Sequence, residues 1–381
     1  MGGVRPCGRI PPRVRAGTVT SCPALSFPAR LRDVAPYALG FLLPPMQVWA
    51  TEAGGAGAWL PLAALFAGVA LLDTLAPPHP VAISRDETVA LDRRLEFRWL
   101  TWAWVPVHIG LLLWALDTAQ GLSGAEWLAL AIGTGAIGGA IGITYAHELV
   151  HRASYWERGL GDVLLALVSY PHFGLTHVHG HHRHVATPHD PATARLGEGL
   201  YPFLVRSMLG GVREALAIEA ARLSRAGRSP WHPSNRCWRY GAAMVAVYGA
   251  GAWLAGWNGV GFLALQSLMA VLLLETINYV EHYGLRRREV SPGRYEPVAA
   301  HHSWDSSHRV SNWLLMNLAR HAEHHLVASR RYQALGTQRA APQLPAGYGS
   351  MLLLATVPPL WRRVMDPRVA AWAADTDGEV A

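Results

Sequence analysis

The stretch AIGTGAIGGAIGITYAHELVHR, residues 131–152, has no charged side chain until it reaches His147 and Glu148. A second histidine, His151, follows four positions after the first, and an α-helix places residues four apart on one face. A bilayer core needs roughly 20 mostly apolar residues per helix. The stretch therefore predicts a membrane-spanning helix that ends in a pair of candidate metal ligands.

The rest of the chain repeats this apolar character. Hydrophobic residues make up 51% of the 381 residues, and 16 tryptophans are present, which is too apolar for an ordinary soluble enzyme. Six stretches are long enough to cross a bilayer, namely about 35–53, 58–76, 99–118, 126–147, 239–257 and 260–282. The first contains Pro44 and Pro45. We expect an all-α, polytopic membrane protein with six transmembrane helices.

The distribution of arginine predicts an orientation. All 33 basic residues are arginines, and they lie in the N-terminal tail, at 77–98, at 151–239 or after residue 285. Because arginine-rich segments stay on the cytoplasmic side of a membrane, we expect both termini and the histidine-rich segments in the cytoplasm of a bacterial inner-membrane protein. The formal net charge of +7 is then explained by the arginines of the cytoplasmic segments, which set the orientation in the membrane. No nucleic-acid binding is expected.

The same features predict the domain organisation. Residues 1–34 are arginine-rich, contain Pro and Gly throughout and lack a signal-peptide pattern, so we expect a disordered cytoplasmic tail. A single membrane domain would cover 35–373, followed by a short tail at 374–381. Within this domain, 204–227 predicts a helix that either lies on the membrane interface or packs over the histidine-rich segments. The three cysteines form no CxxC pair, so no thiolate metal site is expected.

Three further groups of histidines lie on the predicted cytoplasmic side. They are His177, His181 and His182 in THVHGHHRHVATPHDPATAR (176–195), His282 after Glu281 in NYVEHYGL (278–285), and His321, His324 and His325 in RHAEHH (320–325). Neutral imidazole suits iron, zinc, copper and nickel. Because a zinc ion usually takes four ligands, nine histidines indicate two metal ions.

Several kinds of chemistry fit two such ions. HELVH matches a zinc-protease signature, but a zinc hydrolase needs only three protein ligands and one open position. A pair of imidazole-bound redox metals favours iron and dioxygen, with the protein positioning a lipid-soluble substrate. A metal transporter or store is the alternative without catalysis, and the position of the histidines at helix ends rather than at the midplane disfavours transport.

Taken together, these segments resemble the integral-membrane alkane 1-monooxygenases, relatives of the xylene monooxygenases and the membrane fatty acid desaturases. The resemblance covers about 35–373 and includes GHHRHVATPHDPATARLGEGLY, GRYEPVAAHHSWDSSHRVSN and LPAGYGSMLLLATVPPLWRRVMDPRV. It implies a non-haem di-iron enzyme that hydroxylates the terminal carbon of medium- to long-chain n-alkanes with O2. Electrons would come from NADH through a rubredoxin reductase and rubredoxin. A related enzyme acting on alkyl-aromatics or fatty acyl chains is the alternative.

The resemblance also implies roles for individual residues. The ligands of the two Fe ions would be His147, His151, His177, His181, His182, His282, His321, His324 and His325. Glu281 would be a catalytic carboxylate, either a ligand itself or an immediate neighbour of the ligands. Carboxylates that accept the other ring N–H orient metal-bound histidines, and the candidates here are Glu148, Asp190, Asp305 and Glu323. Two positions depart from the family, which usually has Glu at Thr176 and Asn at Asp305. His108, His172 and His302 receive no assigned role.

One residue of the span at 58–76 is implied to set the length of the substrate. Leu62, Leu65, Val69 and Leu72 would share one face of this helix. In the alkane hydroxylases the helix lines the hydrocarbon channel, and a bulky aromatic at the position of Leu65 is associated with shorter chains. Leucine would leave room for long chains. The alternative is that Leu65 faces lipid.

Overall fold

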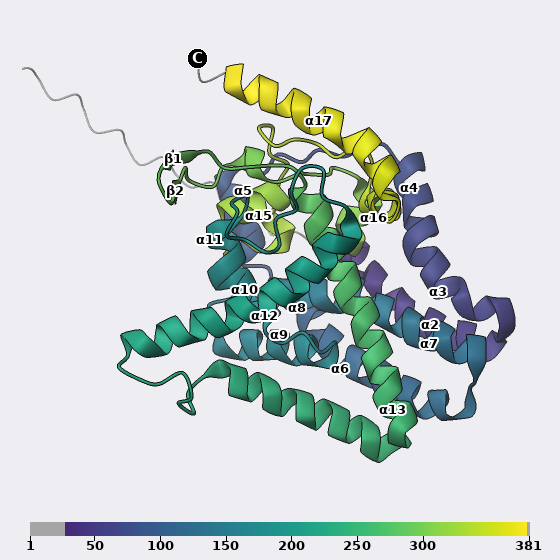
Figure 1. Cartoon of the computed structure of the whole chain (residues 1–381). Helices are drawn as coiled ribbons and strands as arrows, with labels where there is room; N and C mark the ends of the chain where they lie inside the picture. The colour runs from purple at the N-terminus through teal and green to yellow at the C-terminus, as the bar shows by residue number, and fades with distance from the viewer. Residues whose placement is uncertain (1–26, 379–381) are drawn as a thin grey trace, which may run out of the picture.

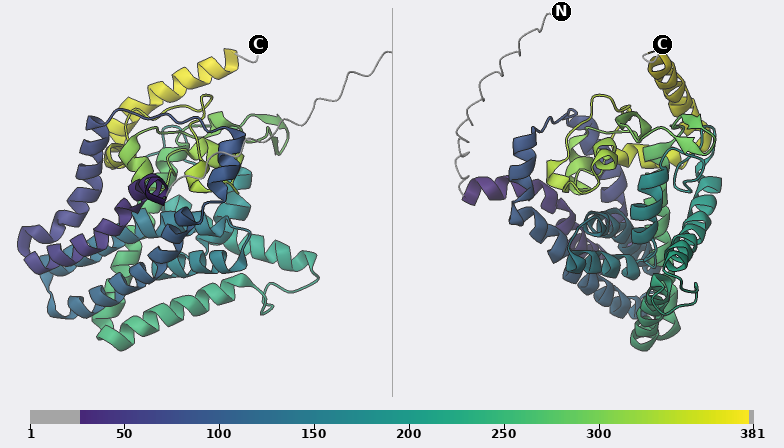
Figure 2. Two further views of the ribbon diagram at one scale, coloured as in Figure 1. Left: turned by 180° about the vertical axis from the view of Figure 1, so that it is seen from behind. Right: turned by 90° about the vertical axis from the view of Figure 1, so that its left-hand side faces the viewer.

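The structure, a computed structural model that describes residues 27–378, consists of helices and one short β-hairpin (Figures 1 and 2). The α-helices are α1 (Phe27–Val34), α2 (Leu43–Ala53), α3 (Leu60–Ala63), α4 (Val69–Leu75), α5 (Arg85–Asp92), α6 (Leu95–Thr118), α7 (Gly124–Ile137), α8 (Ile143–Val150), α9 (Tyr155–Leu167), α10 (Phe173–Thr176), α11 (His182–His184), α12 (Leu200–Arg225), α13 (Arg236–His282), α14 (Arg309–Leu314), α15 (His321–Leu326), α16 (Tyr348–Ala355) and α17 (Pro358–Gly378). The hairpin pairs β1 (Glu289–Ser291) with β2 (Arg294–Tyr295). The prediction of a helical protein is confirmed, with this hairpin as the exception among the described residues.

Four helical segments are long and apolar enough to cross a membrane. They are Gly55–Leu75, Leu95–Gly121, Gly124–Val150 and Arg236–His282. Large apolar side chains project from them, since Trp253 is 84% exposed and Trp257 is 89% exposed. Tryptophan is enriched where a helix meets the membrane–water interface. These long apolar helices indicate an integral membrane protein.

The last of these segments, α13, is interrupted near its middle. It contains 47 residues, which at 1.5 Å per residue would be roughly 70 Å long, about twice the hydrocarbon core of a bilayer. The backbone leaves the helical conformation at Ala255 and Gly256, where Gly256 has φ of 58°, a region that favours glycine. The two halves point in different directions (Figure 1). This break lies where the sequence predicts the boundary between the last two spans.

The first predicted span, 35–53, is not one long helix. Residues Ala35–Leu42 form a 3₁₀ helix, and α2 begins at Leu43 with Pro44 and Pro45 in its first turn. Proline lacks the backbone N–H that a helix interior needs and is suited to a helix start. The prolines therefore begin a new helix, and the prediction of six spans is confirmed only to the extent of four long apolar helices.

The structure describes part of each predicted tail. Residues 27–34 form α1, and Arg94 binds both the carboxylate of Asp33 and the backbone carbonyl of Arg30. At the other end, α17 continues to Gly378. Residues 1–26 and 379–381 of the predicted tails lie outside the described part of the chain. The helix predicted at 204–227 corresponds to α12.

Close packing of α7 against α13 positions the ends of both helical segments. A Cβ on Gly139 would lie 2.7 Å from the carbonyl oxygen of Ala270, so only glycine permits this approach. Gly139 belongs to a π-helical turn, Gly138–Gly142, that joins α7 to α8. The segment through α8 therefore brings His147 close to the end of α13, where His282 lies. The short helices α10, α11 and α15 lie beside this region (Figure 1).

Candidate metal centre

The structure brings the nine predicted ligands together in two groups. The five-histidine group contains His147, His151, His177, His182 and His324, and the four-histidine group contains His181, His282, His321 and His325. In each group, one ring nitrogen from every histidine lies within 4.8 Å of all the others. Each group takes ligands from segments far apart in the sequence, so its assembly depends on the tertiary fold.

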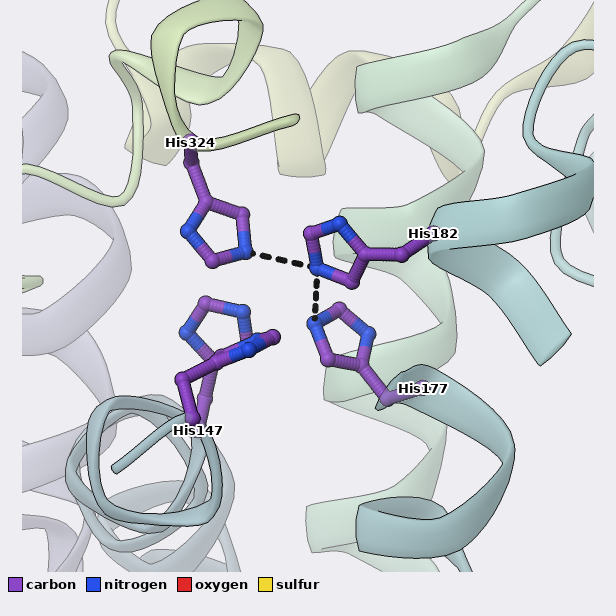
Figure 3. Close-up of side chains that lie close together, drawn as sticks. His147, His177, His182 and His324 are labelled. Atoms are coloured by element: carbon purple, nitrogen blue, oxygen red, sulfur yellow. Dashed lines mark hydrogen bonds between the residues drawn. The ribbon is translucent and has the colours of Figure 1, made fainter. Parts of the chain in front are cut away.

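The geometry of the five-histidine group is that of ligands around a single ion. The rings of His147, His177, His182 and His324 converge in Figure 3. His182 Nε2 lies 3.1 Å from His177 Nε2 and 3.0 Å from His324 Nε2. With metal–nitrogen bonds of about 2.1 Å, ligands at right angles have nitrogens about 3.0 Å apart. The observed spacing matches this arrangement.

The four-histidine group has the same spacing. His321 Nε2 lies 3.1 Å from His282 Nε2 and 2.9 Å from His325 Nε2. The fourth member, His181, places Nδ1 2.8 Å from the Asp190 carboxylate. A proton on Nδ1 is donated to Asp190 and leaves the lone pair of Nε2 directed at the group.

The protonation states of these histidines also suit a metal. Burial lowers the pKa of His321, His324 and His325 well below the usual value, and the neighbouring histidines lower it further. These imidazoles are therefore neutral at physiological pH, which is the metal-binding form. The Nε2 atoms of His147, His151 and His181 are buried and accept no hydrogen bond within residues 27–378. Both groups are suited to metal binding.

Glu281 lies at the edge of the four-histidine group. Its Oε2 is 3.3 Å from His321 Nε2, and its Oε1 accepts a hydrogen bond of 2.8 Å from the Tyr348 hydroxyl. Both carboxylate oxygens thus have fixed positions. Tyr348 was not singled out from the sequence, where it lies inside the family-like segment LPAGYGSM without a signal of its own.

Of the four acidic candidates for orienting the ligands, only Asp190 contacts a histidine side chain of either group in the described structure. Glu148 accepts the backbone N–H of Tyr332, and Glu323 binds Arg330 and the backbone of Gly336. Burial raises the pKa of Asp190, but His181 and Thr193 outweigh this effect and hold it below its usual value. Glu148, Glu323 and Asp305 therefore do not orient a histidine ring in the described structure; Glu148 and Glu323 fix backbone segments around the site.

The two departures from the family are compatible with this geometry. The Thr176 hydroxyl donates to backbone carbonyls of its own segment, those of His172 and Phe173. Asp305 accepts the backbone N–H of Ala322 at 2.7 Å, in the first turn of α15. An asparagine oxygen could accept the same bond. Asp305 thus fixes the helix that carries His321 rather than a histidine ring.

The histidines without an assigned role lie outside both groups. His108 is fully buried against the π-helical turn at Gly142. The ring of His172 packs on the ring of Tyr170, with 4.4 Å between the ring centroids. His302 lies near Glu296 and His301 in a third cluster of metal-binding residue types. However, His302 Nδ1 accepts the N–H of Ala299, and its Nε2 faces Glu296 at 3.3 Å. A neutral His302 ring then has no lone pair left for a metal.

A small cavity, here called the histidine chamber, lies between the two groups and the apolar helices. It is lined by His147, His177, Glu281, His321, Asn278 and apolar side chains that include Ile143, Leu274, Ile277 and Leu318. A neighbouring apolar cavity shares Ile277 with it and is lined by Leu65, Phe66, Val69, Leu273, Tyr348 and Leu352. Leu65 is only 6% exposed. It therefore faces the protein interior rather than lipid.

The predicted stripe around Leu65 is only partly correct. Leu65 and Val69 are buried, but Leu72 is 51% exposed and Asp73 is buried in its place. Residues Ala64–Gly68 form a π-helical turn, which adds a residue to the turn and shifts the periodicity that follows. Asp73 then accepts hydrogen bonds from the backbone of Val310 and Ser311.

This chain is similar in sequence to a known protein family and to several known proteins. The fatty acid desaturase family model matches residues 121–354, which include all nine histidines. Alkane 1-monooxygenase 2 of Pseudomonas aeruginosa is 40% identical over 343 residues, which cover 87% of this chain and 89% of that protein.

Two further relatives agree. Alkane 1-monooxygenase 1 of Pseudomonas aeruginosa is 44% identical and covers 72% of this chain and 73% of its own length. The xylene/toluene monooxygenase hydroxylase component of Pseudomonas putida is 31% identical, with 60% of each chain covered. This chain therefore belongs to the alkane 1-monooxygenase family, within the wider family that the fatty acid desaturase model describes.

Proposed function

We propose that this protein is a non-haem di-iron monooxygenase that converts medium- to long-chain n-alkanes to 1-alkanols with O2. The observation that carries this proposal is the division of nine buried histidines into groups of five and four in a chain of this family. We assign one Fe ion to each group, with Glu281 beside the four-histidine ion. When bound, the two ions supply the redox chemistry that activates O2.

The protein's own residues prepare the chamber for this reaction. Asp190 holds the ring of His181, and Tyr348 holds Glu281. The apolar side chains of Leu274, Ile277 and Leu318 border the chamber, where they exclude water and accept a hydrocarbon. The terminal carbon of the substrate would then lie beside the histidines and Glu281.

The apolar cavity at Leu65 supports an alkane rather than a polar substrate. It adjoins the chamber at Ile277, and most of its lining consists of Leu, Val, Ile, Phe and Ala side chains. Each buried CH2 contributes roughly 0.8 kcal/mol to binding, so a chain that extends along this cavity gains affinity with length. We assign Leu65 as the residue that limits how far the tail of the substrate reaches.

We propose that rubredoxin, reduced by an NADH-dependent rubredoxin reductase, supplies the electrons. A hollow of about 840 Å³ opens beside the five-histidine group and is lined by His151 together with Arg152, Arg158, Arg236 and Arg239. One carboxylate, Asp162, lines the same hollow. The excess of positive charge suits an acidic electron carrier, and electrostatic complementarity accelerates such encounters.

We also propose six membrane crossings, with the histidine groups and both termini in the cytoplasm. The two halves of α13 would cross separately, and the 3₁₀ helix with α2 would form the remaining crossing. The arginine-free loop 119–125 would then face the periplasm, and the loop 226–235, which contains Arg228, would face the cytoplasm.

Cysteine labelling tests this topology. In a chain whose native cysteines are replaced by serine, Ser123→Cys should react with a membrane-impermeant maleimide added from the periplasmic side. The matched variant Ser229→Cys should react only after the membrane is opened, because both serines are exposed and differ in the predicted side. The opposite labelling pattern would invert the topology.

A competition assay tests the activity. The purified protein in lipid, with NADH, rubredoxin reductase and rubredoxin, should convert hexadecane to 1-hexadecanol in preference to a fatty acid or xylene supplied at the same concentration. Omitting rubredoxin should remove turnover. Products identified by mass spectrometry that consist mainly of hydroxylated xylene or a desaturated acid would favour the related enzymes instead.

Substitution of one histidine in each group tests the metal assignment. His181→Ala and His324→Ala should each lose about one of two iron equivalents and lower turnover at least about a hundredfold, since even residues that only support a ligand cost 10–100-fold. Elemental analysis and the alkane assay measure both effects. His189→Ala, an exposed histidine outside both groups, is the control. Full iron content in His181→Ala or His324→Ala would show that the substituted residue is not a ligand.

Substitution of Leu65 tests the substrate route. Leu65→Trp should reduce activity on hexadecane far more than on octane, because the larger ring shortens the apolar cavity. Leu71→Trp is the matched control, since Leu71 lies on the same helical segment but is 59% exposed. Rates with both alkanes decide the question. Equal losses on the two substrates would show that Leu65 does not limit chain length.

A further inference from the structure

A buried carboxylic acid, Glu275, lies inside the membrane-spanning part of α13. It is 3% exposed, and no ion pair in the described part of the chain includes it. Its oxygens accept hydrogen bonds from the hydroxyls of Tyr170 and Ser207 and from the amide of Asn278. Ionisable side chains at such depth are costly and usually functional. The metal groups described above do not use Glu275.

Glu275 lines a small polar cavity next to the histidine chamber. The other polar residues around this cavity are Tyr170, Thr176, His177, His181, Asp190, Ser207, Glu214 and Asn278. The cavity has room for about one water molecule, and polar groups that surround such a space can hold it. This composition contrasts with the apolar cavity at Leu65.

One face of α12 forms the wall of the polar cavity. Ser207, Gly211 and Glu214 follow at intervals of four and three residues and therefore share a face. Gly211 has no side chain, and a Cβ placed there would lie 3.7 Å from both the Tyr170 hydroxyl and His172 Nε2. His172 Nε2 is buried and has no hydrogen-bond partner within residues 27–378. Glu214, the polar groups beside Gly211 and Ser207 thus form a polar line along this face of α12, and its inner members Tyr170 and Ser207 bind Glu275.

The outer end of this line is Glu214. The residue is half-buried, so part of it reaches the surface of the protein while it also lines the polar cavity. The carboxylate rests on Gly180, where any side chain would overlap it. The Glu214 carboxylate therefore packs directly against the backbone of the segment that carries His177 and His181.

The inner end of the line reaches the histidine chamber. Asn278, one helical turn after Glu275 and hydrogen-bonded to it, lines both the polar cavity and the chamber. Phe173 and His177 also line both. The carboxyl group of Glu275 is thus separated from the chamber by a single layer of side chains.

We propose that this polar cavity delivers protons from Glu214 to the histidine chamber, with Glu275 as the last proton-carrying residue before it. The inference rests on the proposed function, in which RH, O2, two electrons and two protons give ROH and H2O. One oxygen atom enters the C–H bond, and the other leaves as water with both protons. The electron carrier supplies the electrons. Among the residues that line the chamber, Glu281 is the one carboxylate, and the Thr144 hydroxyl is already bound to the carbonyl of Ala140.

The proposal is tested with the holoenzyme carrying Glu275→Gln, which keeps the shape and polarity of the side chain but cannot carry the proton. Iron content should stay at the wild-type level. Turnover of hexadecane should fall about a hundredfold, the usual contribution of a positioned proton donor, and its solvent deuterium isotope effect should rise. Infrared difference spectra in H2O and D2O should show a carboxylic acid band in the resting wild-type protein that the variant lacks.

Three further variants separate proton transfer from structural support. Glu275→Asp keeps the acid and should recover most of the turnover, whereas Glu214→Gln should lower turnover with unchanged iron content. Ser267→Ala removes a buried hydrogen-bonding side chain two turns earlier in α13 and should change neither the isotope effect nor the infrared band.

The outcomes distinguish this inference from the proposed function. If the wild-type protein makes alcohol and Glu275→Gln makes it at the same rate, Glu275 is only a structural residue and the inference is wrong. If Glu275→Asp is as slow as Glu275→Gln despite full iron content, the shape of the side chain and not its proton is what matters, which also overturns the inference. If the wild-type protein makes no alcohol, the proposed function itself fails.

Discussion

The convergence of nine imidazoles in one buried region is the constraint on which the remaining structure depends. Protonated imidazoles at separations near 3 Å would repel one another strongly in a medium of low dielectric constant. The fold therefore has to keep them neutral, and it does so by burial. It must also hold backbone segments that are distant in sequence at fixed separations. Glycines at the contact of α7 with α13 provide the close approach. Asp305 fixes the first turn of α15, the helix that carries His321, His324 and His325, and Glu323 fixes the loop at Gly336.

Much of this centre could be predicted from the sequence, because helical spacing and charge distribution are local properties. Histidines four apart in HELVH, and His321 followed three and four residues later by His324 and His325, indicated shared helix faces, and the arginine pattern indicated the membrane. The division between groups could not be predicted. His181 and His182 are neighbours in the chain but belong to different groups, because successive residues of a helix point about 100° apart, and His182 directly follows the π-helical turn at His177–His181. Such a turn has no dependable sequence signal.

The same limitation explains the other differences. A regular helix predicts Leu72 on the face of Leu65, whereas the π-helical turn at Ala64–Gly68 buries Asp73 instead. The role of Glu281 was implied by the family resemblance, but its partner Tyr348 lies 67 residues away and meets it only through the tertiary fold. Glu275 was not singled out from the sequence, where it is a single acid within an apolar stretch. In the structure its side chain is buried and is paired with no cationic side chain of the described residues, and burial of an ionisable group in this way costs free energy.

The second half of α13 places two unlike environments against the same reaction chamber. Leu273 and Ile277, four residues apart, line the apolar cavity, whereas Glu275 and Asn278, three apart, line the polar cavity. Successive residues of a helix point about 100° apart, so the adjacent residues Ile277 and Asn278 separate the two environments while both line the chamber. The proposed hydrocarbon route has to exclude water, because removal of the alkyl chain from water into an apolar environment is what favours its binding. A dry route of this kind does not carry protons, so in the proposal above they travel along the separate polar face of the same helix.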